Sequence, residues 1–225
     1  MPRISESTIR ADFHTHTRFS HDGYQTPRQL VERAREVGLD RVAVTDHHAI
    51  DGALRARDLD PERIIVGEEI TTRCHTDIIG LYLTKRIAPR LSLEEVIDEI
   101  HAQGGVVYLP HPFAYLRGVR ERVDRVLPFA DIVEVWNSRA FYTPWNLRAM
   151  QEIRERGIPE AAGSDAHFSA ELGRAVTVMP SFNDARTLKA AARHARAVHD
   201  GHTYMLPHVG SIGCMTVTLI RRVFR

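Results

Sequence analysis

Short apolar runs alternate with amphipathic helical segments along most of the 225-residue chain, and this alternation limits the fold more than any other feature. The runs are rich in β-branched side chains, which is typical of buried parallel strands. They cover residues 9–13, 41–45, 63–67, 77–84, 105–109, 131–136 and 158–163. Strand–helix alternation of this kind predicts an α/β fold, either an open doubly wound sheet or a closed barrel.

The segments between these runs contain recognisable helix ends. Ser92 and Glu95, for example, form a capping box, and Gly104 ends the same predicted helix. The helices predicted in this way cover residues 26–38, 92–104, 143–157 and 184–195.

Composition narrows the classes of function. The 30 Lys and Arg residues balance 29 Asp and Glu residues, so no charge excess predicts a stable nucleic-acid partner or a membrane surface. No stretch reaches the roughly 18 apolar residues of a membrane span, and residues 1–14 lack the apolar segment of a signal peptide. Two isolated cysteines give no sign of a disulfide framework. We therefore expect a cytoplasmic protein without membrane attachment, and the oligomeric state stays open.

Five of the apolar runs lead into residue types that bind metals. These residues are His14 and His16, then Asp46, His47 and His48, then Glu68 and Glu69, then His111, and finally Asp165 and His167. The C-terminal strand ends of a parallel barrel converge on one face, whereas an open sheet gathers such groups mainly at one switch point. Polar groups at five separate strand ends therefore favour a barrel.

The local spacing also suits a metal site. His14 and His16 are two residues apart, so both imidazoles point to the same side of an extended strand, and Asp165 and His167 repeat this spacing. Imidazoles combined with carboxylates bind Zn, Mn or Fe. A carboxylate such as Glu69 can bridge two ions, which together clamp a phosphoryl group and activate water. Each motif alone could be a helix cap or a turn. Their joint occurrence predicts a metal centre, because buried histidines and carboxylates without partners would destabilise the fold.

The order of the motifs resembles that of the PHP (polymerase and histidinol phosphatase) domain family in its short, stand-alone form. The matching segments are DFHTHTRFSHDG at 12–23, AVTDHH at 43–48, GEEITT at 67–72, LPHPF at 109–113, DIVEVWNSR at 131–139 and GSDAH at 163–167. The resemblance covers about residues 9–180. It implies a distorted (β/α)7 barrel with the active site at the C-terminal ends of the strands. We expect a single domain over 1–225, in which residues 181–225 pack onto the barrel.

The same resemblance implies two or three divalent ions, which are Zn, Mn or Fe, with Mg as a further candidate. The implied ligands are His14, His16, Glu69 and Asp165 for one ion, Glu69 and His111 for a second, and Asp22, His47 and His167 for a third. One position departs from the family pattern, because Asp77 stands where many relatives have histidine. We prefer Asp77 as the ligand over His75, two residues earlier, since a carboxylate can bind a hard ion. Aspartate in place of histidine at this position leaves the identity of the second ion open.

The resemblance also implies phosphoester hydrolysis by a metal-bound hydroxide, with Glu69 at the centre of the chemistry. His48 is a candidate proton donor. An arginine is expected to hold the phosphate, because its planar fork matches two oxygens. Arg18, Arg139 and Arg174 are the candidates, and the last two are also candidates for a direct catalytic role.

The expected substrate is a small phosphomonoester, a nucleotide or a short oligonucleotide. Four aromatic residues near the site by sequence could stack on a base or serve ordinary packing, namely Trp136, Phe141, Tyr142 and Trp145. One alternative is an amidohydrolase-like enzyme acting on a non-phosphate substrate, although Lys85 and Lys189 are the only lysines available for a carboxylated-lysine bridge. The other alternative is a catalytically silent metal-binding module.

Overall fold

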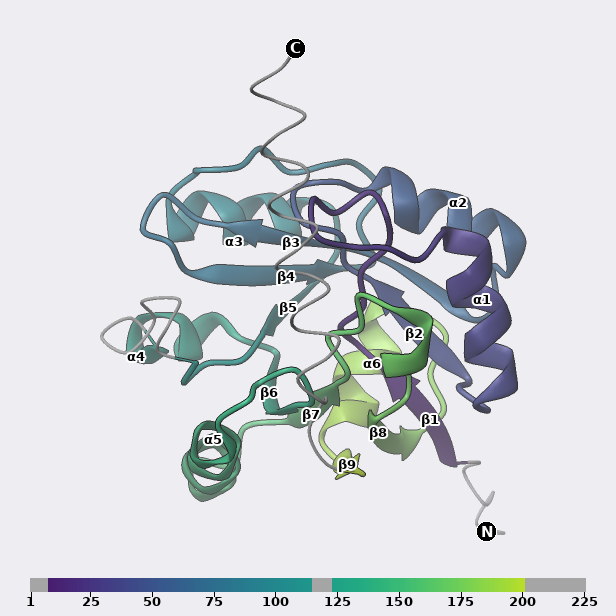
Figure 1. Ribbon diagram of the computed structural model, residues 1–225. Coiled ribbons are helices and arrows are strands. Elements are labelled where there is room, and N and C mark those ends of the chain that lie inside the picture. The colour runs from purple at the N-terminus through teal and green to yellow at the C-terminus, as the bar shows by residue number, and fades with distance from the viewer. Residues whose placement is uncertain (1–7, 115–122, 201–225) are drawn as a thin grey trace, which may run out of the picture.

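The computed structural model describes residues 8–114 and 123–200, and its strands form one nine-stranded sheet in the order β7-β6-β5-β4-β3-β2-β1-β8-β9. The strands are β1 (Thr8–Asp12), β2 (Arg41–Val44), β3 (Ile64–Thr71), β4 (Asp77–Leu81), β5 (Val106–Leu109), β6 (Ile132–Asn137), β7 (Glu160–Gly163), β8 (Ala175–Pro180) and β9 (Arg196–His199). The sheet curves into a nearly closed barrel (Figure 1). The predicted fold class, a distorted β/α barrel, is confirmed.

The prediction of parallel strands is wrong for β4, which runs antiparallel to both β3 and β5. β8 and β9 were not predicted as strands, and β8 runs antiparallel to both β1 and β9. β3 continues to Thr71 and turns directly into β4, so Glu69 lies inside a strand, opposite Ile79, and not after its end. A short turn can join only antiparallel neighbours, because a parallel pair needs a long crossover.

The ends of β1 and β7 are brought together beyond the regular strands. The His16 amide donates to the Ala166 carbonyl at 2.8 Å, and the Asp165 amide donates to the His14 carbonyl at 2.8 Å. Lower in the barrel, the Thr177 hydroxyl of β8 accepts from the Ala162 amide of β7 at 2.9 Å. These bonds satisfy backbone groups that a strand edge would leave unpaired, and they place the first and last metal-binding motifs side by side.

Helices cover the outer face of the sheet. They are α1 (Pro27–Glu36), α2 (Asp51–Leu59), α3 (Leu93–Ala102), α4 (Val123–Val126), α5 (Thr143–Glu155) and α6 (Ala185–Ala192), with short 3-10 turns η2 (Leu127–Phe129) and η3 (Ser169–Glu171). The predicted capping box at Ser92 is present, and another forms at Thr26. Helix α2 was not predicted, and its N-cap Ile50 offers no side-chain capping bond that could have marked its start. No helix among the described residues has the length and apolar character needed to cross a bilayer.

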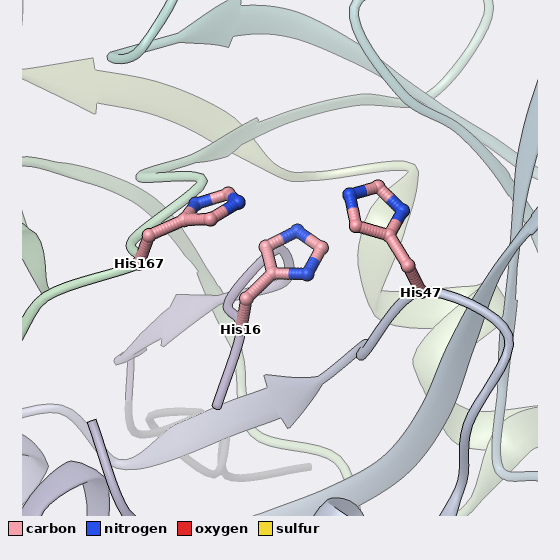
Figure 2. Close-up of side chains that lie close together, drawn as sticks. All are labelled: His16, His47 and His167. Atoms are coloured by element: carbon pink, nitrogen blue, oxygen red, sulfur yellow. The ribbon is translucent and has the colours of Figure 1, made fainter. Parts of the chain in front are cut away.

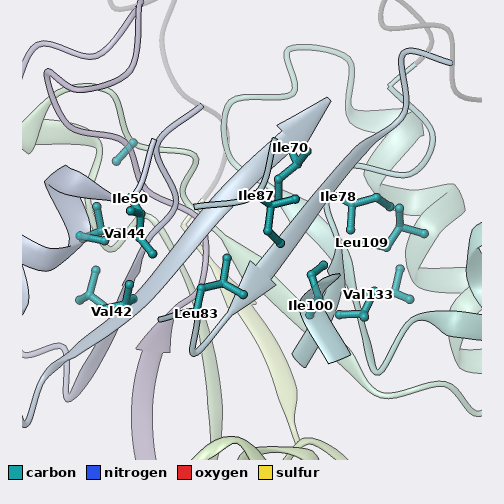
Figure 3. Close-up of a cluster of buried hydrophobic side chains, with 14 of the residues drawn as sticks. Val42, Val44, Ile50, Ile70, Ile78, Leu83, Ile87, Ile100, Leu109 and Val133 are labelled. Carbon is teal, nitrogen blue, oxygen red and sulfur yellow. The ribbon is translucent and has the colours of Figure 1, made fainter. Parts of the chain in front are cut away.

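Alternate residues of each strand enter two different cores. Val42 and Val44 of β2 point toward the helices, whereas Ala43 between them points into the barrel. The outer core continues across β3, β4 and α3 through aliphatic side chains such as Ile70 and Ile100 (Figure 3).

The barrel interior is packed with aromatic side chains beneath the site. The ring centroids of Phe13 and Tyr108 are 6.1 Å apart, and those of Phe13 and Phe182 are also 6.1 Å apart. The Tyr108 hydroxyl donates to the Glu134 carboxylate at 3.1 Å. The apolar interior is thereby joined directly to the polar site above it.

The prediction of one domain over residues 1–225 stays a prediction. Residues 185–199 form α6 and β9, and β9 adds to the sheet beside β8. The rest of the predicted C-terminal packing segment, residues 201–225, lies outside the described residues.

Candidate metal centre

Histidine and carboxylate side chains gather at the C-terminal face of the barrel in three overlapping groups. The groups are His14, Glu69 and His111, then His14, His16 and Asp165, and then His16, His47 and His167, each with ligand atoms within 4.8 Å of one another. A fourth group at the rim combines His21, Asp22 and His47. The structure therefore brings together side chains that the sequence distributes over residues 14–167.

Glu69 lies between two sets of imidazoles. Its Oε2 atom lies 3.3 Å from Nε2 of His14, 3.3 Å from Nε2 of His16 and 3.2 Å from Nδ1 of His47. Its Oε1 atom lies 3.2 Å from Nε2 of His111. Burial alone would raise the pKa of Glu69, but the neighbouring imidazoles, His47 first, hold that pKa well below its usual range. A buried, ionised carboxylate with one oxygen toward each set has the geometry of a bridging ligand.

Asp165 completes the group around His14 and His16. Its Oδ1 atom lies 3.2 Å from Nε2 of His16 and 3.6 Å from Nε2 of His14. Burial would raise the pKa of Asp165, but His14 and then His16 hold it well below its usual range. The backbone at Asp165 is left-handed, with φ of 53°. Non-glycine residues in this region are concentrated at functional sites, where the surrounding structure enforces the conformation.

Asp22 lies beside His47 and His167 of the third group. The Oδ2 atom of Asp22 lies 2.9 Å from Nε2 of His167 and 3.8 Å from Nε2 of His47. Figure 2 shows the rings of His16, His47 and His167 facing a common space, and the His16 ring centroid lies 4.6 Å from that of His47 and 4.3 Å from that of His167. Burial would raise the pKa of Asp22, but His167 lowers it strongly.

The donor set fits divalent cations. The Oδ1 atom of Asp22 is buried without a hydrogen-bond partner among the described residues, and the buried Nε2 atoms of His16 and His167 face carboxylate oxygens at 3.2 and 2.9 Å without a hydrogen bond of standard geometry. Buried polar atoms are normally satisfied, so such atoms call for an explanation. Imidazole nitrogens mixed with carboxylate oxygens suit Zn, Mn or Fe. Ions between these atoms would satisfy them and would offset the buried negative charge.

Glu134 supports two of the candidate ligands and was missed by the sequence analysis. Its Oε1 atom lies 3.1 Å from Nδ1 of His14, and its Oε2 atom accepts from the His111 amide at 2.7 Å and from Nδ2 of Asn137 at 2.9 Å. A carboxylate on the far nitrogen of a metal-binding histidine fixes its tautomer and orientation. Strand alternation would place Glu134 and Asn137 on opposite faces, but a bulge between Glu134 and Trp136 brings both into the site.

Asp46 supports His16 and His47 through the Ser20 hydroxyl, on the other side of the centre. It accepts from the Thr17 amide at 2.6 Å and from the Ser20 hydroxyl at 3.0 Å. The Ser20 hydroxyl in turn lies 3.0 Å from Nδ1 of His16 and accepts from the His47 amide at 2.9 Å. Asp46 stood out in the sequence as part of TDHH, but nothing in its spacing identified Thr17 and Ser20 as its partners.

Other predicted site residues lie outside the three groups. Asp77 is buried in β4 and accepts from the Thr71 hydroxyl at 2.7 Å, while His75 lies in the exposed turn before it. His48 is half-buried with φ of 53°, and burial lowers its pKa. Arg18 is exposed, and Nε of Arg174 donates to the Ala170 carbonyl at 3.3 Å. The roles of these residues stay predictions.

Arg139 forms a buried ion pair next to the centre. Its Nη1 atom donates to Oε1 of Glu171 at 3.0 Å, and both side chains are buried. Oε2 of Glu171 accepts from the His167 amide at 2.7 Å and from the Phe168 amide at 3.0 Å. The geometry therefore makes Arg139 and Glu171 a support for the His167 backbone. The sequence suggested Arg139 as a phosphate ligand and as a catalytic residue, and those roles stay predictions.

Replacing Glu171 with glutamine is expected to lower the metal content by about one ion per chain, because His167 loses its backbone support and Arg139 is left buried without its counter-ion. Removing one partner of a buried pair typically costs about 3–5 kcal/mol. Metal analysis and thermal unfolding measure the two effects. Glu152→Gln is the control, because it removes one partner of a more exposed ion pair with Arg148 on α5. Unchanged metal content in Glu171→Gln would contradict the supporting role.

These features define the chain as a β/α barrel protein with a cluster of histidines and carboxylates, able to bind metal ions, at one face of the barrel. A family model described as PHP domain matches residues 12–123, and one described as PHP-associated matches residues 143–196. The chain belongs to the PHP domain family.

The chain has relatives in sequence and relatives in fold. The uncharacterized protein MJ1587 of Methanocaldococcus jannaschii is 34% identical over 144 residues, which is 58% of this chain and 82% of that protein. A two-domain protein from Bacteroides vulgatus, which contains a predicted PHP-like metal-dependent phosphoesterase, superposes with a TM-score of 0.73 at 20% identity, covering 88% of this chain and 67% of that chain. The lesion-specific endonuclease PfuEndoQ of Pyrococcus furiosus superposes with a TM-score of 0.62 at 15% identity, covering 83% of this chain. This chain spans only 56% of the endonuclease, and at such identities the two solved structures show a common fold.

Proposed function

We propose that the chain is a metal-dependent phosphoesterase that hydrolyses a small phosphomonoester, a nucleotide or a short oligonucleotide. The observation that carries this proposal is Glu69, whose two oxygens face separate imidazole sets at 3.2–3.3 Å. Adjacent cation sites joined by one carboxylate are the arrangement that phosphoryl transfer uses. Membership of the PHP domain family supports the same class of reaction.

The proposed ligands are drawn from the overlapping groups at the barrel face and are assigned to ions as the family resemblance implies. They are His14, His16, Glu69 and Asp165 for one ion, Glu69 and His111 for a second, and Asp22, His47 and His167 for a third. Bound ions would lower the pKa of a water nucleophile and neutralise charge on the phosphoryl oxygens. Glu134 and Asp46 hold the ligand histidines in one orientation, so the site requires little rearrangement when substrate binds.

Three further residues are proposed to act on the substrate. His48 lies beside the centre, and its Nδ1 atom is buried without a hydrogen-bond partner among the described residues, which suits proton donation to a leaving oxygen. Arg18 and Arg174 are the proposed phosphate ligands, because Arg139 already pairs with Glu171. Asp77 stays the proposed variant ligand of the second ion.

The lysine-bridged form of the amidohydrolase alternative finds no support in the structure. Nζ of Lys85 lies 3.3 Å from Glu99, and Nζ of Lys189 lies 2.9 Å from Asp131. Both of these carboxylate partners lie outside the groups around Glu69. The full set of donors also favours an enzyme over a catalytically silent module.

The likeness to a lesion-specific endonuclease makes DNA a second candidate substrate. We favour a small substrate, because 30 basic residues balance 29 acidic ones and duplex binding relies on phosphate neutralisation by excess cations. A cytoplasmic location and the lack of a stable nucleic-acid partner stay predictions.

A substrate panel tests the proposal. The protein is loaded with Mn or Zn, its metal content is measured, and turnover is followed on an aryl phosphate, nucleoside monophosphates, a phosphodiester, a duplex with an abasic site, and a lactone. We expect turnover of the phosphomonoesters, and we expect the rate to be lower in samples that contain less metal. Bound metal without turnover of any phosphoester would indicate a silent module, and turnover of the lactone alone would indicate an amidohydrolase-like enzyme.

A further inference from the structure

The candidate ligands of the three ions are almost closed off from solvent. All of them except His47 are buried, and His47 exposes only 9% of its side chain. A metal site built in this way needs a path by which its ions reach it. His21, which precedes the candidate ligand Asp22 in the chain, exposes 51% of its side chain and lies beside the same cluster.

His21 belongs to the rim group with Asp22 and His47, whose ligand atoms lie within 4.8 Å of one another. The ring centroids of His21 and His47 are 5.0 Å apart, and Nδ1 of His21 lies 4.0 Å from Oδ1 of Asp22. That Oδ1 atom is buried and has no hydrogen-bond partner among the described residues. A buried carboxylate oxygen is normally satisfied, and a cation held between this oxygen and the imidazoles would satisfy it.

The rim group differs by one residue from the ligands proposed for the third ion. Oδ2 of Asp22 lies 2.9 Å from Nε2 of His167 and 3.8 Å from Nε2 of His47, whereas Oδ1 is the oxygen near His21. Figure 2 shows His47 and His167 on either side of His16. Asp22 and His47 are therefore common to an outer and an inner set of ligands, and half-exposed His21 takes the place that buried His167 has in the inner set.

The turn that carries His21 is held in place on both sides. The Ser20 hydroxyl donates to Asp46 at 3.0 Å. Gly23 packs so closely on Thr17 that a Cβ atom would lie 1.9 Å from the Thr17 carbonyl oxygen. His21 is thereby kept beside the cluster, and the turn needs little ordering when a ligand binds.

We propose that His21 is a loading ligand, which captures a divalent cation from solvent together with Asp22 and His47 and is then exchanged for His167. In this exchange one metal–nitrogen bond breaks and another forms, while Asp22 and His47 stay bound. The inference rests on the metal centre of the proposed function, and it does not depend on which ester is hydrolysed. His21 sets the rate of metal uptake and is not a ligand of the loaded site.

His21→Gln tests the loading role through the rate of metal uptake. Protein stripped with a chelator is mixed with Zn or, separately, with Mn, and an indicator of free metal follows the uptake. We expect Zn uptake to slow about tenfold, the lower end of the effect of losing a supporting residue of a metal site. Mn uptake should slow less, because Mn prefers oxygen ligands to imidazole. The final content of each metal should equal that of wild type.

His101→Gln is the matched control, because His101 is an exposed histidine on α3, and it should take up both metals at the wild-type rate. Zn uptake by His21→Gln at the wild-type rate would overturn the inference. Equal slowing of Zn and Mn would also overturn it, since a distorted turn affects both metals alike. A final content lower by one ion would make His21 a permanent ligand and would overturn the loading role.

Uptake and turnover separate failure of this inference from failure of the proposed function. Wild-type protein that binds no metal overturns both. Metal uptake without turnover of any phosphoester contradicts the proposed function alone, and slower Zn uptake in His21→Gln then still supports the loading role.

Discussion

Replacing Glu69 with glutamine is expected to remove at least one ion per chain and to lower kcat/KM by about a thousandfold, equivalent to about 4 kcal/mol of transition-state stabilisation. The carboxylate faces His14, His16 and His47 with one oxygen and His111 with the other. A glutamine keeps only one acceptor oxygen and turns an amide group toward the second set. Metal analysis and steady-state kinetics on an aryl phosphate measure the two effects.

Glu68→Gln is the matched control for this change. Glu68 is the adjacent buried carboxylate of β3, and the Ile87 amide donates to it at 2.8 Å. Burial raises the pKa of Glu68 to about 7, so the neutral glutamine resembles a form that is already populated near neutral pH. We expect Glu68→Gln to keep its metal content. If Glu69→Gln matches this control in both metal content and rate, the bridging role is wrong.

Metal removal is expected to abolish turnover and to lower the thermal unfolding midpoint by roughly 10 °C. A ligand present at about 1,000 times its Kd stabilises the native state by about 4 kcal/mol, and in a chain of this size about 1 kcal/mol shifts the midpoint by roughly 2–4 °C. The physical reason is that Glu69 and Asp165 are buried carboxylates beside four or more imidazoles, and bound cations would offset their negative charge and bind the imidazole nitrogens. Scanning calorimetry before and after chelation measures the shift.

Two comparisons make the chelation experiment specific. Mn or Zn added back should restore both the midpoint and the activity, and Glu69→Gln should show a smaller shift than wild type. His101→Ala should behave as wild type, because His101 is an exposed histidine on α3. An unchanged wild-type midpoint after verified metal removal would show that the buried charges are compensated within the protein.

The chain order of the motifs was enough to predict the fold class and the position of the polar groups. His14, Glu69, His111 and Asp165 follow or belong to four different strands, and a barrel necessarily brings such strand ends to one face. The structure places their side chains together, and their roles as metal ligands stay predictions. The antiparallel course of β4 was not predictable from its composition, because a short apolar run looks the same in either direction.

The residues that support the candidate ligands could not be predicted from the sequence. Glu134 reaches His14 because a bulge in β6 changes the side-chain alternation, and no local signal in the sequence marks that bulge. Glu171 holds Arg139 across 32 positions of the chain. A sequence displays which residues are chemically suited to a site, but not which of them pair.

The sequence by itself therefore determined that this protein is an α/β barrel with imidazoles and carboxylates at its strand ends, because strand periodicity and residue chemistry are local properties. Only the tertiary structure decided that Glu69 faces both imidazole sets, that Arg139 supports His167 and that Tyr24 stacks on Phe168. The physical reason is that hydrogen bonds, ion pairs and ring contacts act over a few ångströms, and residues far apart in the chain come within that distance only when the barrel closes.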